Sequence, residues 1–237
     1  MHPAVLLLSL ASAAVADPGC IPRTSASQGF RLIVNVTDPS KDFSPSINGQ
    51  QFTNAHIGPS QNRGIVVPSA GAVFYQNGTY ADIDKHTLQI INDAGSAPGV
   101  FPQTVTYQQE SVDTFGQGLY INGGALSGGV ALSRLADPYS YLSILEGVVS
   151  STLVVCSQTI PYYGDDRKFN VVNWVQATRD SSGTSVKVPE GCAPINLVAE
   201  CAELAPLPEG AYSSHEFAQE VRCYEKVADI DWSKYSF

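Results

Sequence analysis

Short apolar runs separated by turn residues fill the chain from residue 30 to about residue 176. Runs such as 65–67, 88–91 and 152–155 have the length and the β-branched content of strands. No stretch in this region shows about ten residues of helical period. The pattern predicts an all-β domain, either an antiparallel sandwich or a barrel. Unevenly repeated aromatic-x-Asn-Gly units leave a β-trefoil as an alternative.

The first sixteen residues predict a secretory signal peptide. Residues 4–13 form an apolar run that is too short to span a bilayer, and small residues at Ala14 and Ala16 suit signal peptidase. We therefore expect a mature chain that begins at Asp17, with a flexible lead-in over residues 17–29. No later segment has about 18 consecutive apolar residues, so no membrane span is predicted.

Five cysteines agree with export to an oxidising compartment, where four of them can pair. The sequence leaves several connectivities open, and we favour Cys156 with Cys192 and Cys201 with Cys223. Cys20 is then left over near the start of the mature chain. No two cysteines have the C-x₂-C spacing of a zinc site, and no metal or other cofactor is predicted.

The character of the chain changes after residue 188, which we take as the end of a β domain over residues 30–188. The segment 189–237 is rich in proline and holds three of the cysteines. Within it, Ser213 and Glu216 have the spacing of a capping box, and Phe217, Val221 and Tyr224 follow at helical spacing. This pattern predicts a short C-terminal helix, tied to the β domain through a disulfide.

Two N-glycosylation motifs are present, at Asn35 and at Asn77. In the predicted strand over residues 30–36, the apolar side chains share one face and Asn35 points the other way, toward water. Asn77 begins an Asn-Gly pair typical of a type I′ turn, which is also exposed. Both sites are predicted to carry glycans.

The charge content excludes some partners. The chain has a net charge of −9, and only 15% of its residues are charged. An acidic chain without a Lys/Arg cluster is poorly suited to nucleic acid or to an anionic membrane. Its surface has to consist largely of uncharged polar residues, as in many extracellular, glycan-rich settings.

One loop combines aromatic rings with carboxylates, which makes it the candidate ligand site. Tyr162 and Tyr163 precede Asp165 and Asp166 across one glycine. Tyrosine can stack on a sugar ring and can also form hydrogen bonds. Paired acids such as these, or Asp82, can act in sugar hydrolysis where they flank a cleft. No G-x-S-x-G or H-E-x-x-H motif is present, and no catalytic residue is assigned.

Three segments carry a family resemblance: the predicted strand 30–38, the aromatic-Asn-Gly segment 74–79 and the tail segment 214–224. They resemble an uncharacterised domain family of secreted ascomycete proteins. The order of strands and cysteines is also similar to that of fungal phialide cell-wall proteins. The resemblance implies a fungal extracellular protein and brings no catalytic residues.

The leading hypothesis is a non-enzymatic extracellular or cell-wall protein of unknown molecular activity. A β module that binds glycan or another small extracellular ligand is the first alternative, because of the tyrosines. A secreted carbohydrate-active enzyme is the second alternative, because of the paired acids.

Overall fold

The computed structural model describes residues 22–85, 87–108, 117–124, 129–133, 142–144, 151–176, 178–180 and 183–235. The predicted signal peptide and Cys20 lie outside the described residues. The strands are β1 (Ser25–Ser27), β2 (Gly29–Val36), β3 (Gln51–Gly58), β4 (Gln61–Val67), β5 (Phe74–Asn77), β6 (Gln89–Ala94), β7 (Phe101–Gln108), β8 (Gln117–Gly123), β9 (Val130–Leu132), β10 (Leu142–Ile144), β11 (Ser151–Thr159), β12 (Lys168–Gln176), β13 (Thr178–Asp180), β14 (Gly183–Ser185), β15 (Cys192–Ala202), β16 (Ala218–Gln219) and β17 (Val221–Cys223). The helical segments are α1 (Tyr80–Asp84) and the 3₁₀ turns η1 (Pro39–Lys41), η2 (Pro161–Tyr163), η3 (Val227–Asp229) and η4 (Trp232–Lys234).

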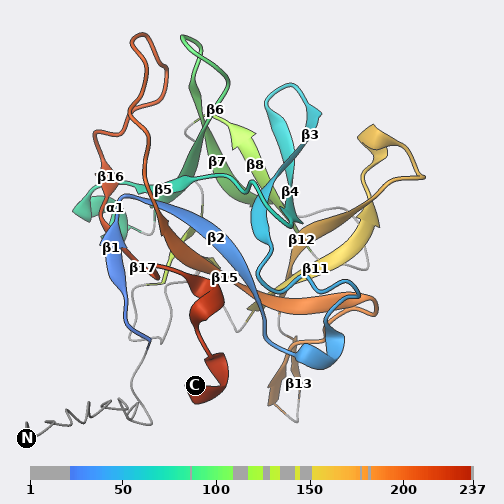
Figure 1. The fold of residues 1–237 in the computed structure, drawn as a ribbon. Coiled ribbons are helices and arrows are strands. Elements are labelled where there is room, and N and C mark those ends of the chain that lie inside the picture. The colour runs from blue at the N-terminus through green and yellow to red at the C-terminus, as the bar shows by residue number, and fades with distance from the viewer. Residues whose placement is uncertain are drawn as a thin grey trace, which may run out of the picture.

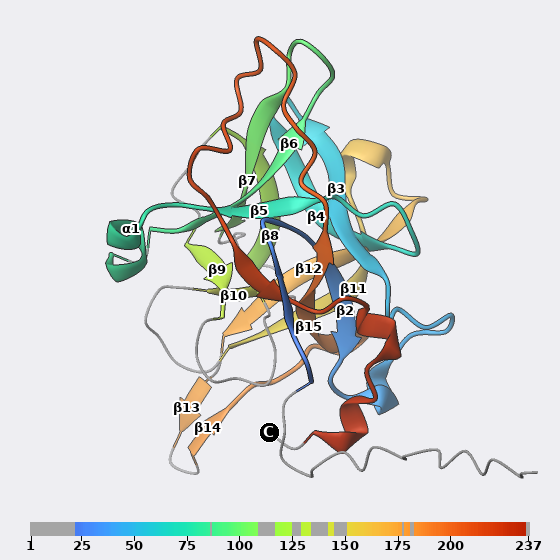
Figure 2. The same cartoon turned by 60° about the vertical axis from the view of Figure 1, so that its left-hand side comes forward.

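One antiparallel sheet runs in the order β11-β15-β2-β3-β4-β12-β8-β7-β6-β5-β16. It closes on itself because β11 also pairs with β12 and β2 also pairs with β5 (Figure 1, Figure 2). Closure of this kind leaves few strand edges unpaired. The all-β prediction is confirmed, and of the three architectures considered the chain forms a barrel.

Alternating residues of the strands fill the barrel. On β2, the apolar residues Phe30, Leu32 and Val34 join the main core cluster. Phe52 stacks on Phe74 with ring centroids 5.6 Å apart. Gly64 lies beside this stack, where a Cβ would come within 2.8 Å of the Phe52 ring and 2.9 Å of a backbone oxygen. The backbone at residue 64 therefore lies so close to the core side chains that no residue larger than glycine fits.

The domain division predicted from the sequence needs two corrections. Strand β15 comes from the predicted tail, yet it lies between β11 and β2 in the barrel sheet. Residues 25–27 of the predicted flexible lead-in form β1, which pairs with β17. Both segments are therefore parts of the folded β-structure, and residue 188 is not a boundary between separate units.

The predicted C-terminal helix is wrong. Residues 218–219 and 221–223 are strands that pair with β5 and β1. Val221 and Cys223 are both buried in the core cluster, whereas the intervening Arg222 is exposed, which is the period of a strand. The capping box does not form, because the Glu216 N–H is bonded to the Ser214 hydroxyl, 3.2 Å away. Pairing with distant strands overrides the local helical pattern.

Both predicted disulfides are confirmed. Cys156 and Cys192 are directly opposed residues of β11 and β15, with Cα atoms 4.3 Å apart. Cys201 on β15 is bonded to Cys223 on β17. The second bond joins the barrel sheet to the small β1–β17 sheet.

The predicted turn at Asn77-Gly78 is also different in the structure. Asn77 ends β5, and Thr79 caps α1 instead of opening a return strand. The Thr79 hydroxyl and the Asp82 carboxylate form a capping box. A longer connection then leads to β6, which pairs with β5. Among the described residues, no helix is long and apolar enough to cross a membrane.

Candidate functional site

A pocket of about 530 Å³ lies on the outer wall of the barrel. Its walls come from β3, β4, β8, β11, β12 and the turn η2, so distant parts of the chain build it together. The volume falls within the usual range of small-ligand sites. The residues that line it are Ile57, Arg63, Tyr120, Gln158, Thr159, Ile160, Pro161, Tyr162 and Val171.

Arg63 is the buried cation of this pocket, with 6% of its surface exposed. It faces outward because its neighbours Asn62 and Gly64 occupy the alternate positions of β4. Its Nη1 donates to the Leu119 carbonyl at 3.0 Å, and its guanidinium carbon lies 4.6 Å from the centre of the Tyr120 ring. Tyr120 is its cross-strand partner on β8. The ring and the backbone therefore hold the guanidinium in one orientation.

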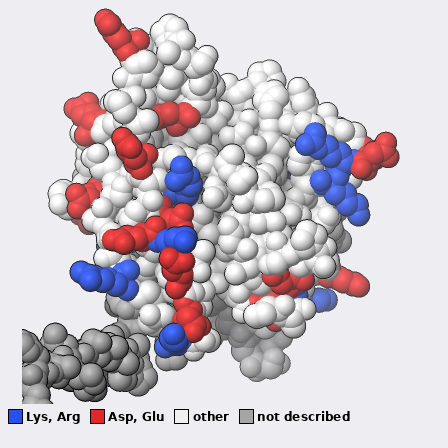
Figure 3. Space-filling view, viewed as in Figure 1, with Lys and Arg blue, Asp and Glu red and all other residues white. Residues whose placement is uncertain are grey.

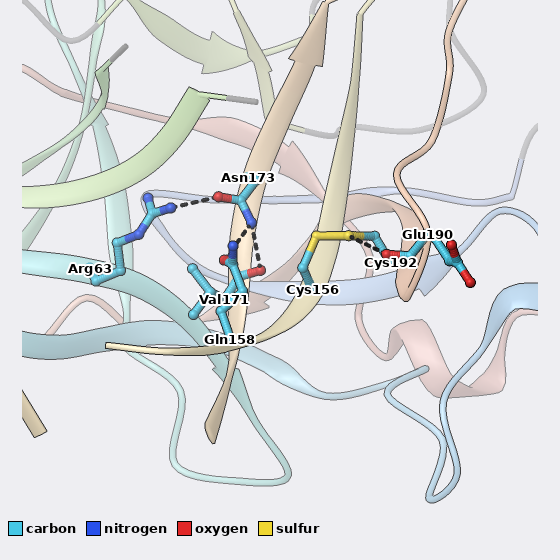
Figure 4. The surroundings of a disulfide bond; sticks show 7 residues. All are labelled: Arg63, Cys156, Gln158, Val171, Asn173, Glu190 and Cys192. Carbon is cyan, nitrogen blue, oxygen red and sulfur yellow. Dashed lines mark hydrogen bonds between the residues drawn. A yellow bond between two sulfur atoms is a disulfide. The ribbon is translucent and has the colours of Figure 1, made fainter. Parts of the chain in front are cut away.

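Asn173 fixes the other side of the guanidinium. Its Oδ1 accepts from Nη2 of Arg63 at 2.5 Å, and its Nδ2 donates to Gln158 Oε1 at 3.0 Å. Asn173 is fully buried. Figure 4 shows this chain of side chains beside the disulfide Cys156–Cys192. A buried hydrogen-bonded chain of this kind orients its members and is costly to break.

Tyr162 forms the exposed rim of the pocket, with 59% of its surface exposed. Its ring makes edge contacts with His56, at 5.4 Å between centroids, and with Tyr163, at 5.3 Å. Tyr163 packs in turn on Phe169, 4.8 Å away. These ring contacts hold Tyr162 in place while leaving much of it open to solvent.

The residues of the predicted site separate in the structure. Tyr162 lines the pocket, and Tyr163 supports it from behind. Asp165 and Asp166 are exposed in the following turn and do not line the pocket. The aromatic part of the candidate loop therefore meets a cavity, whereas its two acids do not.

The sequence did not identify Arg63, Gln158 and Asn173 as residues of the site. They lie on three different strands, and no local motif connects them. The one available signal is the alternation of β4, which predicts that Arg63 shares a face with Ile65.

The other predicted acid, Asp82, has a structural role. The Thr79 hydroxyl donates to Asp82 Oδ2 at 2.6 Å, and this bond is the main reason why the pKa of the Asp82 carboxyl is lowered. Among the described residues, no group of three or more His, Cys, Asp or Glu could hold a metal ion. His215 contacts Asp93 through Nε2 at 2.8 Å.

The two glycosylation motifs lie in different surroundings. Asn35 does alternate with the core residues of β2, but it is only 8% exposed, so the expected exposure toward water is wrong. Ile33, on the same face of β2, packs under the C-terminal segment. Asn77 is partly exposed at the end of β5.

Comparison with known proteins places these features in a wider context. The model of a domain of unknown function, DUF7907, matches residues 27–201. The chain is 36% identical over 217 residues to the antigenic protein SchS34 of the fungus Stachybotrys chartarum, which covers 90% of this chain and 93% of that protein. No solved structure matches significantly.

Proposed function

The chain belongs to the DUF7907 family, and we propose that it is a secreted, non-enzymatic protein that binds extracellular glycan through the pocket around Arg63. Two disulfides support an oxidising, extracellular setting. The predicted signal peptide and the resemblance to secreted fungal proteins support the same setting. Cell-wall glycan is the proposed ligand class.

The chemistry of the pocket carries this proposal. A guanidinium, one amide side chain and hydroxyls lie together with the Tyr120 and Tyr162 rings and with aliphatic side chains. A sugar presents apolar ring faces and a rim of hydroxyls, so both kinds of lining have a counterpart on it. Figure 3 shows that much of the face seen in Figure 1 carries no charge, as suits a protein in a hydrated glycan network.

The distribution of acids favours binding over hydrolysis. A glycosidase needs two carboxyl groups that flank the scissile bond, roughly 5–9 Å apart. Among the described residues that line the pocket there is no Asp or Glu. Asp165 and Asp166 point into solvent from a turn, and Asp82 caps α1.

Replacing Tyr162 with alanine tests the binding proposal. Tyr162→Ala removes an exposed ring from the pocket rim and leaves the barrel core intact, so the affinity for a bound oligosaccharide should fall at least about tenfold. A glycan array identifies the oligosaccharide, and calorimetric titration then measures the affinity. Tyr212→Ala is the matched control, because Tyr212 is also well exposed but does not line the pocket. Equal affinity for both variants would place the ligand elsewhere.

Secretion is tested separately at the N-terminus. We expect the protein recovered from the medium to begin at Asp17, because the small residues Ala14 and Ala16 precede that bond. Mass spectrometry of the N-terminal peptide measures this. Recovery of a chain that still begins at Met1 from the medium would contradict the predicted signal peptide.

A further inference from the structure

The two glycosylation motifs have unequal surroundings in the folded protein. Asn35 lies in the ladder between β2 and β15, opposite Asn196, and is 8% exposed. Asn77 is the last residue of β5 and is partly exposed. Figure 2 shows that α1, which follows directly, projects from the side of the barrel. Asn77 also pairs with strands on both sides, but as a partly exposed strand end it leaves more space for a large solvated group than Asn35 does.

Thr79 is the hydroxyl residue of the glycosylation motif at Asn77, and its hydrogen bonds bear on when a glycan is transferred. Thr79 donates from Oγ1 to Asp82 Oδ2 at 2.6 Å, and its N–H donates to the same oxygen at 2.7 Å. The acceptor motif depends on this hydroxyl residue, and the folded chain already engages it. Transfer to Asn77 is therefore favoured before α1 forms, while the Thr79 hydroxyl is free of Asp82. What distinguishes the two sites is the fold that each glycan later has to fit.

The reaction changes one atom of the asparagine. Nδ2 attacks the anomeric carbon of an oligosaccharide carried on a lipid diphosphate, loses one proton, and the lipid diphosphate leaves. The product amide keeps one N–H, so Asn77 can still donate to Gln89 Oε1, which lies 3.2 Å from its Nδ2. At Asn35 the same product would attach a large solvated group to a residue that is only 8% exposed, and packing sugar hydroxyls against the covered wall of the barrel is unfavourable.

Two exposed rings lie beside Asn77. Tyr80 is 87% exposed and Phe217 is 50% exposed. Tyr80 begins α1, three residues after Asn77. The Phe217 carbonyl accepts from the Gly78 N–H at 3.1 Å, which brings Phe217 close to Asn77 in space. Exposed aromatic rings can stack on sugar rings. The first sugars of a glycan on Asn77 would lie over these rings.

We propose that Asn77 carries an N-linked glycan in the secreted protein and that Asn35 does not. The inference rests on the proposed function only in requiring that the chain enters the secretory pathway. A chain that acquires a glycan on Asn35 cannot close β2 under its outer cover, so it does not reach the medium as folded protein.

Expression of the full chain in a yeast secretory host tests the proposal. Glycopeptide mapping and intact mass, before and after endoglycosidase treatment, give the occupancy of each site. Asn77→Gln removes one acceptor, and Thr37→Ala removes the other through an exposed residue, without altering buried Asn35. We expect one glycan on the wild-type protein and on Thr37→Ala, and none on secreted Asn77→Gln.

The outcomes separate this inference from the proposed function. A glycan on Asn35 of the secreted protein, or an unmodified Asn77, overturns the inference. A second version, with the host's own signal peptide in place of residues 1–16, enters the pathway even where the native segment does not. If only the version with the native residues 1–16 failed to be secreted, the proposed secretion would be contradicted. The occupancy of Asn77 would still be measured in the version with the host's signal peptide.

Discussion

Replacing Cys201 and Cys223 together with alanine is expected to lower the free energy of unfolding by about 3 kcal/mol. The disulfide joins residues separated by 22 positions, and loss of that constraint increases the conformational entropy of the unfolded chain. Cys201 lies on β15 inside the barrel sheet, and Cys223 is fully buried in the core cluster. Unfolding in urea, followed by circular dichroism, measures the change.

This structure also changes the expected course of unfolding. With a separate tail, loss of the bond would free the C-terminal segment while the β domain stayed folded. Because β15 is a barrel strand, we expect one cooperative transition at lower urea instead. Cys20→Ala is the control, since Cys20 takes part in neither disulfide. Release of the tail by protease at an unchanged midpoint would contradict this interpretation.

Asn173→Ala is expected to lower the free energy of unfolding by about 2 kcal/mol and to weaken glycan binding at least tenfold. The variant removes the oxygen that accepts from Nη2 of Arg63, and it does so in a fully buried place. A hydrogen bond to a charged donor contributes more than a neutral one. The guanidinium would also lose its fixed orientation in the pocket.

Gln158→Ala, at the next member of the hydrogen-bonded chain, is compared with Asn173→Ala. Gln158 accepts from Asn173 Nδ2, and both groups are neutral, so loss of this bond should lower the free energy of unfolding by about 1 kcal/mol. Urea unfolding and calorimetric titration of both variants give the two effects side by side. A larger loss of unfolding free energy for Gln158→Ala than for Asn173→Ala would contradict the assignment of the bond to Arg63 as the stronger one.

Local sequence patterns predicted the class of the fold well. Whether a short β-branched run between turn residues forms a strand depends largely on residues close to it in the sequence. The all-β class could therefore be predicted. Export predicted that four cysteines pair, but the sequence left the connectivity open, and the structure decides it in favour of the preferred pairs. The helix at Ser213 failed because β17 pairs with β1, about 200 residues earlier, and such pairing leaves no local signal.

The candidate site shows the same limit. Tyr162 was predicted because aromatic and acidic residues cluster in its loop. Arg63, Tyr120 and Asn173 meet through the mutual pairing of β4, β8 and β12, which are far apart in the sequence. Asn35 was placed on the correct face of its strand, but the sequence does not show what covers that face.

Glycan binding at the outer pocket is the central claim, and NMR titration of the isotope-labelled protein tests it most directly. Soluble β-1,3-glucan and chitin oligosaccharides serve as the probes. We predict that one of them shifts the signals of Tyr120, Tyr162 and the Gln158 side-chain amide in a saturable manner, and that the signals of Tyr212 and His215 stay unchanged. Saturable shifts around His215 with an unchanged pocket, or no shifts with any probe, would contradict the claim.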